Sequence, residues 1–314
     1  MTFDKYLIDD LINITSNAAA ECYKYIGKND KNLADKAATD NMRKNLNLLN
    51  IDGQVVIGEG ELDEAPMLYI GEKLGTGKGP SLDIAVDPVE GTNFAAKNLP
   101  GALSVIAVAE KSNLFNAPET YMDKIAILSS EKGIVDLDNS VTKNIKNLAD
   151  YKNVQPDNLT ACILDRPRHK KHIEELKALN VKLKLISDGD VSGALLVTDK
   201  KYNVDIFLGI GGGPEGVLAA SALDAYGCFF QGKFLFETEE DKLRAKKMGI
   251  ENFKKKYDLN EIVSGDSIFC ATGITSGDLV EGINIKKDFF TSETLVTHKS
   301  SGIQKVVKSK YKIK

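Results

Sequence analysis

Tryptophan is absent from this chain of 314 residues, and aromatic residues make up only 7% of it. Single-strand binding proteins stack unpaired bases on aromatic side chains, and this sequence has few to offer. The net charge of −4 gives no basic field that would attract nucleic acid. Both deficits argue against a nucleic-acid partner.

Cysteine is also scarce, and long apolar runs are missing. Cys22, Cys162, Cys228 and Cys270 form no CxxC pair, which argues against a zinc ribbon or a redox dithiol. No run of 18 apolar residues is present to span a membrane. The opening residues MTFDKYLIDDLIN lack the basic start and apolar core of a signal peptide. We therefore expect free thiols, no membrane partner and a cytoplasmic location.

The hydrophobic pattern predicts an α/β protein. Leu7, Leu11, Ile14 and Ala18 recur at helical spacing, and residues 32–50 are expected to form a second helix. Short strands are expected at 53–61, 82–93, 102–110 and 123–130. Further strands at 159–165, 181–187 and 202–210 alternate with helices, as in βα units.

A polar stretch at residues 151–156 suggests where two lobes meet. We expect one lobe over 1–155 and a second over 156–314. The basic tail SSGIQKVVKSKYKIK is expected to form an edge strand whose lysines prevent pairing with other chains.

Two acids end the second expected strand, in the segment Asp87-Pro88-Val89-Glu90-Gly91-Thr92. Proline keeps the preceding Asp87 extended, and the turn that follows lets Glu90 point back at the same space. Gly91 permits an unusual dihedral angle or a close backbone approach. The hydroxyl of Thr92 falls near a helix start, where it could cap the helix or orient a water molecule. An ordinary strand–turn–helix, with Thr92 as the cap, is the alternative interpretation.

More acids lie nearby in the sequence. The segment GEGELDEAP carries Glu59, Glu61, Asp63 and Glu64, and Asp35 lies on the second expected helix. Like charges 4 Å apart repel by roughly 4 kcal/mol at an effective dielectric constant near 20, and bound divalent cations would remove that repulsion. A set of oxygen ligands alone favours Mg²⁺ or Mn²⁺ over Zn²⁺. Glu61 and Glu64 are expected to be surface residues.

Glycine, arginine and aspartate mark candidate anion and sugar sites in the second half. GIGGGPEG opens into a helix with Pro214 in its first turn, which suits an anion. Its GxGxxG match, at residues 211–216, leaves a dinucleotide-dependent oxidoreductase open. RPRHKKH places cations at a helix start, where the helix dipole disfavours them by roughly 0.3–1 kcal/mol each. We expect Arg166 and Arg168 to bind phosphate, with lysines splayed into solvent as the alternative.

The segment SDGD allows two interpretations. Asp190 is either a helix N-cap, or Asp188 and Asp190 accept hydrogen bonds from sugar hydroxyls. The three histidines, His169, His172 and His298, show no Ser-His-Asp setting, which argues against a serine hydrolase.

Taken in order, the segments NIDGQVVIGEGELDEAPMLYIGEKLGTG, DIAVDPVEGTN, RPRH, SDGDV, GIGGGPEG and ATGITSGDLVEG resemble class II fructose-1,6-bisphosphatases over nearly the whole chain. DPVEGT also resembles the Asp-Pro-x-Asp-Gly-Thr element of lithium-sensitive, metal-dependent sugar phosphatases, with Glu90 in place of the aspartate. The resemblance implies a layered α-β-α-β-α sandwich of two lobes, with metal binding in the lobe over 1–155 and sugar-phosphate binding in the lobe over 156–314. It also implies hydrolysis of the 1-phosphate of fructose 1,6-bisphosphate in gluconeogenesis, with at least two Mn²⁺ or Mg²⁺ ions, by a homodimer or homotetramer.

The same resemblance implies a set of site residues. Asp35 and Glu59 would bind one ion, and Asp87, Glu90 and Glu215 a second. A cation would explain why a glutamate, Glu215, lies in a segment otherwise suited to an anion. Asp63 and Thr92 would serve the attacking water. The implied substrate contacts are Glu90, Gly91, Thr92, Tyr121, Arg166, Pro167, Arg168, Asp188, Gly189, Asp190 and Gly212.

Three alternatives to this function stay open. One is a neighbouring specificity, for sedoheptulose 1,7-bisphosphate or an inositol phosphate. Another is the dinucleotide-dependent oxidoreductase built on the glycine segment. The third is a sugar-phosphate sensor without catalytic activity, which the intact acids at all five implied ligand positions disfavour.

Overall fold

A computed structural model describes residues 5–58 and 68–313. The chain divides into two compact units, and each has its own β-sheet. Unit 1 comprises Met1–Asn116 and Val263–Lys314, and unit 2 comprises Ala117–Ile262. Both units combine helices with a sheet that has parallel and antiparallel pairs, which confirms the α/β class. Within the described ranges, every helix is too short or too polar to cross a lipid bilayer.

Unit 1 contains three helices and eight strands among its described residues. The helices are α1 (Lys5–Tyr23), α2 (Lys31–Leu46) and α3 (Thr92–Lys97). The strands are β1 (Asp52–Ile57), β2 (Lys73–Leu74), β3 (Ser81–Glu90), β4 (Leu103–Glu110), β11 (Ser267–Gly273), β12 (Asn284–Lys286), β13 (Phe289–His298) and β14 (Ile303–Lys312). The sheet order is β12-β13-β11-β4-β3-β1-β2, and β14 pairs with β13.

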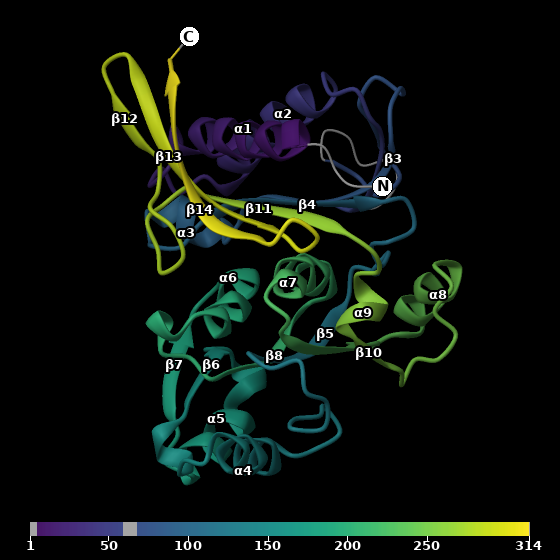
Figure 1. Cartoon of the computed structure of the whole chain (residues 1–314), viewed down its shortest axis with the longest axis vertical. Coiled ribbons are helices and arrows are strands. Elements are labelled where there is room, and N and C mark those ends of the chain that lie inside the picture. Colours follow the sequence, from purple (N-terminus) through teal and green to yellow (C-terminus); the bar gives the residue numbers. More distant parts are fainter. Residues whose placement is uncertain (1–4, 59–67, 314) are drawn as a thin grey trace. The chain divides into compact units, whose positions relative to one another are not determined.

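Helices α1 and α2 lie on one face of this sheet (Figure 1). The predicted stripe of α1 is confirmed, because Leu11, Ile14 and Ala18 are buried in the core and Leu7 packs against it. Strands β4 and β11 are buried along almost their whole length. That burial explains why their sequences are continuously apolar rather than alternating.

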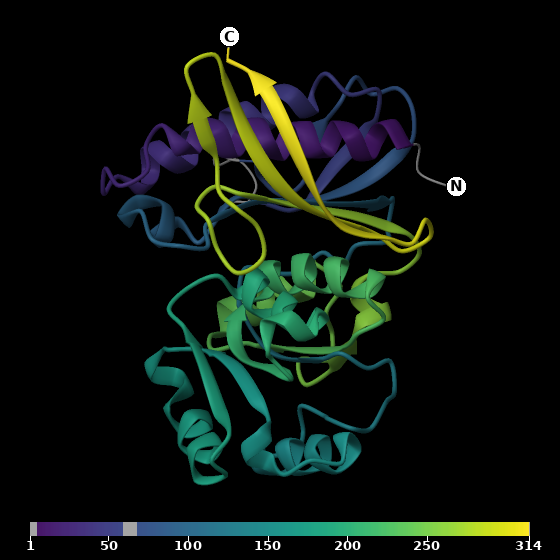
Figure 2. The same cartoon turned by 60° about the vertical axis from the view of Figure 1, so that its left-hand side comes forward.

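The basic tail forms the edge strand that the sequence predicts. Among the described residues β14 pairs only with β13, in ten consecutive register pairs from Phe289↔Lys312 to His298↔Ile303. The two strands form a long twisted ribbon (Figure 2). Lys305, Lys308 and Lys310 project from β14 at a free edge, and such charges discourage pairing with another chain.

Unit 2 contains the remaining elements. Its strands are β5 (Tyr121–Ile127), β6 (Thr160–Leu164), β7 (Lys182–Ile186), β8 (Ile206–Gly212), β9 (Phe229–Leu235) and β10 (Lys256–Asp258). Its α-helices are α4 (Val141–Lys152), α5 (Lys170–Ala178), α6 (Asp190–Leu195), α7 (Gly213–Ala225), α8 (Glu239–Lys247) and α9 (Leu259–Ile262). The short 3₁₀ turns are η1 (Pro156–Asn158), η2 (Pro167–His169), η3 (Leu196–Thr198) and η4 (Lys200–Tyr202).

The sheet of unit 2 has the order β10-β9-β5-β8-β6-β7. Helices α6 and α7 lie on one face, and α4 and α5 lie on the other (Figure 1). Side chains of β5 alternate between these faces. Ile125 and Ile127 join the core beside α4 and α5, whereas Met122 and Lys124 lie next to Gly216 of α7.

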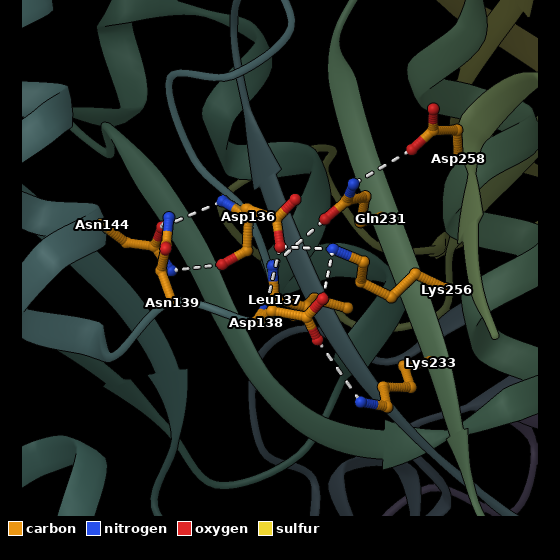
Figure 3. Close-up of polar contacts among 9 residues, drawn as sticks. All are labelled: Asp136, Leu137, Asp138, Asn139, Asn144, Gln231, Lys233, Lys256 and Asp258. Atoms are coloured by element: carbon orange, nitrogen blue, oxygen red, sulfur yellow. Dashed lines mark hydrogen bonds and ion pairs between the residues drawn. The ribbon is translucent and has the colours of Figure 1, made fainter. Parts of the chain in front are cut away.

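A polar network ties the segment before α4 to β9 and β10 (Figure 3). The ammonium of Lys256 contacts Asp136 Oδ1 at 2.5 Å and Asp138 Oδ2 at 2.7 Å. Gln231 accepts a hydrogen bond from the Leu137 backbone N–H (3.1 Å), and its side-chain amide donates to Asp258 (3.1 Å). This network holds a segment without regular structure against two strands.

The expected lobe boundary near residue 155 falls inside unit 2, between α4 and η1. The chain instead returns to unit 1 after α9, because β11 inserts between β4 and β13 in the first sheet. Seven register pairs, from Ser267↔Ala109 to Gly273↔Leu103, join β11 to β4.

Candidate active site

In unit 1 the acids of DPVEGT lie at the end of β3. The pairing of β3 with β4 is irregular here, since Asp87 lies opposite Val105 and Glu90 opposite Leu103. Three steps along β3 thus match two steps along β4, as in a β-bulge. Since side chains two positions apart on a strand share a face, the bulge brings Asp87 and Glu90 to one face of the sheet. The bulge therefore explains how two acids three residues apart can share one face.

The turn after Glu90 follows the sequence prediction in part. Gly91 adopts a left-handed conformation (φ 78°, ψ 50°) and precedes α3 as its N-cap. Thr92 is therefore the first residue of the helix, and the cap interpretation of its hydroxyl is wrong, because no side chain caps α3. Glu90 is 4% exposed, and Asp87 accepts a hydrogen bond from the Val89 backbone N–H at 3.1 Å.

Asp35 lies on α2, which packs against β3 and α3. Burial raises the pKa of the Cys22 thiol to about 12, and the negative charge of Asp35 adds to that rise. The predicted site residues Glu59 and Asp63 lie outside the described residues, as do Glu61 and Glu64.

In unit 2 the predicted phosphate-binding residues make two separate contacts, one through Arg168 and one through Arg166. Tyr121, the first residue of β5, lies opposite Gly212, the last residue of β8. The Arg168 guanidinium stacks on the Tyr121 ring, 4.8 Å from its centroid, and its Nε donates to the Ile210 carbonyl at 2.9 Å. Arg166 lies 3.7 Å from Asp188 Oδ1. Tyr121 keeps 42% of its surface exposed, so a ligand can reach this group.

His169 holds the RPRH turn in place. Its Nδ1–H donates to the Leu164 carbonyl at 2.7 Å, and its Nε2 accepts from the Ile210 backbone N–H at 2.7 Å. The ring is fully buried, and burial lowers its pKa. His169 is therefore a neutral link between η2 and β8 that fixes the adjacent Arg168.

Asp190 begins α6, and the N-cap is Gly189 in a left-handed conformation (φ 82°). The N-cap interpretation of Asp190 is thus wrong. The carboxylate instead contacts the ammonium of Lys124, which is 1% exposed and also donates to the Gly212 carbonyl at 2.7 Å. Lys124 was missed at the sequence level. The sequence feature that could have found it is a lysine within the mostly apolar strand segment DKIAIL, at a position where the side chain faces a helix.

Glu215 lies in the first turn of α7, with its Oε2 atom shielded from solvent and without a hydrogen bond from any described group. Burial raises the pKa of this carboxyl group; the Lys124 charge opposes the rise, and the charges of Asp190 and Asp188 add to it. An oxygen atom in such a position suits a hard divalent cation.

The glycine segment has a role that differs from the predicted anion loop. Gly211 and Gly212 are the last residues of β8 rather than a loop. A Cβ atom on Gly211 would lie 2.0 Å from Asp190 Oδ2, and one on Gly212 would lie 1.8 Å from Glu215 Oε2. The two glycines therefore make room for carboxylates. Glu215 occupies the approach to Gly212 that a dinucleotide phosphate would need.

This geometry does not test the predicted metal ligands. Within the described ranges, no three side chains of His, Cys, Asp or Glu group closely enough to hold an ion. The predicted set, however, includes Glu59 from outside those ranges and draws on both units. The donors that are described, Asp35, Asp87, Glu90 and Glu215, are all carboxylates, which fit Mg²⁺ or Mn²⁺.

The expectation that no histidine has a Ser-His-Asp setting is wrong for His298. The Nδ1 of His298 lies 2.7 Å from Ser301 Oγ, and its Nε2 lies 2.8 Å from Asp266 Oδ2. These residues lie around the turn between β13 and β14, where Ser300 also donates to Asp266 at 2.5 Å. Burial acts to raise the pKa of Asp266, but hydrogen bonds from Ser300 and His298 hold it below its usual range. The cluster satisfies a buried histidine in a hairpin.

Stacked and paired arginines beside carboxylates at strand ends are typical of a site for a sugar phosphate. Residues 5–311 match the family described as bacterial fructose-1,6-bisphosphatase, glpX-encoded. The chain therefore belongs to this family.

Similar proteins carry names that agree with the family. The chain is 43% identical over 308 residues to "Fructose-1,6-bisphosphatase 1 class 2" of Escherichia coli (strain K12), covering 93% of this chain and 91% of that protein. It is 41% identical over 307 residues to "D-fructose 1,6-bisphosphatase class 2/sedoheptulose 1,7-bisphosphatase" of Synechococcus sp. (strain CC9902), covering 93% and 92%. A relative of the same name from Prochlorococcus marinus (strain AS9601) is 40% identical over 304 residues, covering 92% and 91%.

Among solved structures, "Thermotoga maritima IMPase TM1415" matches with a TM-score of 0.31 and 15% identity. The match covers 63% of this chain and 79% of that one. A likeness at this level carries no argument about the fold.

Proposed function

We propose that this protein hydrolyses the 1-phosphate of fructose 1,6-bisphosphate, yielding fructose 6-phosphate and phosphate. The observation that carries the proposal is a pair of arginine contacts in unit 2, where Arg168 lies over the Tyr121 ring and Arg166 lies beside Asp188. In a chain of the bacterial fructose-1,6-bisphosphatase family, this arrangement fits the non-reacting end of a sugar bisphosphate.

The arginines bind the 6-phosphate in this proposal. The Nε of Arg168 is held by the Ile210 carbonyl, and the Tyr121 ring fixes the plane of the guanidinium. Its terminal nitrogens can then donate to a phosphate as a planar fork, which is the geometry that arginine offers and lysine does not. Arg166 adds a second positive charge, and Pro167 fixes the backbone between them.

The sugar ring is held by groups at the start of α6 and the end of β8. Asp188 and Asp190 accept hydrogen bonds from sugar hydroxyls, and the left-handed Gly189 brings their backbone close to the ligand. The Oδ1 atom of Asp190 is shielded from solvent and lacks a hydrogen bond among the described groups, and a sugar hydroxyl that reaches it would supply one. Gly212 contributes a surface without a side chain, against which the ligand can lie.

The reacting phosphate needs charge neutralisation and an activated water, because phosphate monoesters are very inert. Asp35, Glu59, Asp87, Glu90 and Glu215 would hold at least two Mn²⁺ or Mg²⁺ ions, which neutralise phosphate charge and lower the pKa of water. The Thr92 hydroxyl orients the attacking water, and the Asp63 carboxylate takes up its proton. Glu90, Gly91 and Thr92 line the reacting phosphate.

A second substrate is favoured by a specific observation. The relatives from Synechococcus and Prochlorococcus carry the name of a sedoheptulose 1,7-bisphosphatase as well. The same arginine fork would bind the 7-phosphate of the longer sugar. We therefore propose sedoheptulose 1,7-bisphosphate as an alternative substrate.

Phosphate release from both bisphosphates, from fructose 1-phosphate and from inositol 1-phosphate, with Mn²⁺ or Mg²⁺, tests the proposal. We expect release from the bisphosphates alone at physiological concentrations.

Arg168→Ala should raise KM for fructose 1,6-bisphosphate by roughly tenfold or more, since it removes a charged hydrogen-bonding fork. It should leave turnover of a small aryl phosphate nearly unchanged. Lys170→Ala, two positions away at the start of α5, is the matched control. Equal effects of Arg168→Ala on both substrates would contradict the 6-phosphate role.

A further inference from the structure

We propose that Lys124 is a positioning residue of the substrate site. Its buried ammonium fixes the Asp190 carboxylate and the Gly212 carbonyl in the arrangement that receives the sugar. The inference rests on the proposed function, because Asp190 and Gly212 are substrate contacts only within it.

The position of Lys124 is costly unless it has partners. The side chain leaves β5 on the face covered by α7, where it lies beside Met122 and Gly216, and only 1% of it is exposed. Burying an ammonium removes it from water, and the loss is offset only where the charge is paired and hydrogen-bonded. The site therefore has to supply partners for the lysine.

Two partners meet that need from different elements. The Asp190 carboxylate comes from the start of α6 through its Oδ2 atom, and the Gly212 carbonyl comes from the end of β8 at 2.7 Å. One ammonium thus links the middle of β5 to the start of α6 and the end of β8. Because Oδ2 of Asp190 is engaged, its Oδ1 atom is left without a hydrogen bond among the described groups.

The same ammonium acts on two carboxylates. Lys124 also interacts electrostatically with Glu215, whose charge in turn acts on Asp190. Each carboxylate packs directly against one of two consecutive glycines, Asp190 on Gly211 and Glu215 on Gly212. Without the lysine, the buried Asp190 carboxylate would lose its ammonium partner, and it would leave its position.

A purely structural role does not account for a lysine at this position. Replacing a buried ion pair by well-packed apolar residues is often neutral or stabilising. Residues of the same strand that serve only the core, such as Ile125 and Ile127, are apolar. The charge of Lys124 therefore has a use beyond stability, which we assign to the orientation of Asp190.

A double-mutant cycle tests the assignment. Lys124→Met, Lys124→Gln, Asp190→Asn and the double variant Lys124→Met/Asp190→Asn are compared with wild type. We expect Lys124→Met to raise KM for fructose 1,6-bisphosphate by roughly tenfold or more, with a smaller effect on kcat. Lys124→Gln keeps two N–H donors and should recover part of the loss. In the Asp190→Asn background, Lys124→Met should change KM little, because its effect acts through Asp190.

Binding of the product fructose 6-phosphate, measured by calorimetry, supplies a readout that does not need turnover. Its affinity should fall in Lys124→Met by a factor similar to the rise in KM. Lys233→Met on β9, which removes a partly exposed lysine paired with Asp138, is the control and should match wild type.

Three results would overturn the inference. The first is wild-type KM and product affinity in Lys124→Met. The second is a KM in the double variant that rises by the product of the factors measured for Lys124→Met and Asp190→Asn separately. The third is loss of the fold, by circular dichroism, in both lysine variants, because that shows a structural role alone. Failure of wild type to release phosphate from any sugar bisphosphate would instead contradict the proposed function.

Discussion

At the scale of single residues, the site of unit 2 depends on close packing between glycine and carboxylate. Gly212 has no Cβ, and the Glu215 carboxylate fills the space where one would be. The same relation holds between Gly211 and Asp190. Any side chain at either position must displace an acid that the proposed mechanism uses.

We predict that Gly212→Ala lowers the melting temperature and abolishes activity. The new Cβ would lie 1.8 Å from Glu215 Oε2, and overpacking of this kind costs about 1–3 kcal/mol. In Gly212→Ala/Glu215→Ala the clash is gone, so the melting temperature should recover while activity stays lost. Thermal unfolding of the two variants and of Glu215→Ala measures this. A double variant that is no more stable than Gly212→Ala would contradict the contact.

His169 gives a pH dependence whose sign follows from its burial. Its pKa is lowered in the folded protein, so the unfolded chain binds more protons near and below the ordinary histidine pKa of about 6.5. This contribution to stability is full above that pH and is lost as the pH falls. We expect the melting temperature of wild type to fall between pH 7.5 and 5.5 more steeply than that of His169→Gln. Parallel curves would show that His169 does not titrate on unfolding.

The sequence indicated most of these residues but not how they interact. Arg166, Arg168 and Asp188 were identified from charge and spacing, and in the structure Arg166 lies beside Asp188 while Arg168 lies over Tyr121. The roles of Lys124 and His169 were not predicted, because each depends on a partner distant in the chain. Lys124 pairs with Asp190 and the Gly212 carbonyl, and His169 accepts from the Ile210 backbone N–H. Periodicity can assign a lysine to one face of a strand. Whether that lysine is buried follows only once the helix that covers the face is known.

At the scale of elements, the β-bulge at the end of β3 shows how a local irregularity can serve a site. Sequence patterns predicted β3 and α3, yet a regular strand would place Asp87 and Glu90 on opposite faces. The extra residue between them corrects the phase. Such a bulge depends on the pairing with β4, so the local sequence alone could not predict it.

The network in Figure 3 predicts a contribution to the stability of unit 2. The pKa values of Asp136 and Asp138 are lowered: burial acts to raise that of Asp136, but hydrogen bonds from Lys256 lower both. Their contribution is present above the ordinary aspartate pKa of about 4 and is lost as the pH falls further. Because these side chains are partly exposed, we expect Lys256→Met to cost only about 1 kcal/mol.

Urea unfolding of Lys256→Met at low and high salt measures this contribution. The difference from wild type should shrink in 1 M salt, where screening acts over a few ångströms. Lys132→Met removes a lysine that contacts only Asp258 at the edge of the network, and serves as the control. A loss that does not depend on salt would assign the effect of Lys256 to packing of its apolar stem.

At the scale of the whole molecule, the two units divide the proposed chemistry. Unit 1 carries Asp35, Asp87, Glu90 and Thr92, whereas unit 2 carries the arginines, Asp188, Asp190 and Glu215. The sequence suggested two lobes, but it could not show that β11–β14 belong with the first. That membership depends on a long-range pairing of β11 with β4, which leaves no local signal.

Metal removal tests the acids of both units at once. We expect EDTA to abolish phosphate release, and excess Mn²⁺ or Mg²⁺ to restore it, because the proposed ligands are all carboxylates. Asp87→Asn should lose activity at every metal concentration yet retain its affinity for fructose 6-phosphate, whose proposed contacts lie mainly in unit 2. Full activity in EDTA would refute the metal-dependent mechanism.

Light scattering after gel filtration would test the predicted homodimer or homotetramer.

The insertion of β11 between β4 and β13 has a consequence for protein synthesis. When the ribosome has released residues up to α9, unit 2 is complete and can fold, because all of its strands come from one continuous stretch. The apolar edge of β4 has no native neighbour until β11 emerges. A nascent chain of this protein therefore carries an unprotected sheet edge from the emergence of β4 (Leu103–Glu110) to that of β11 (Ser267–Gly273), and that edge is where a ribosome-associated chaperone would be needed.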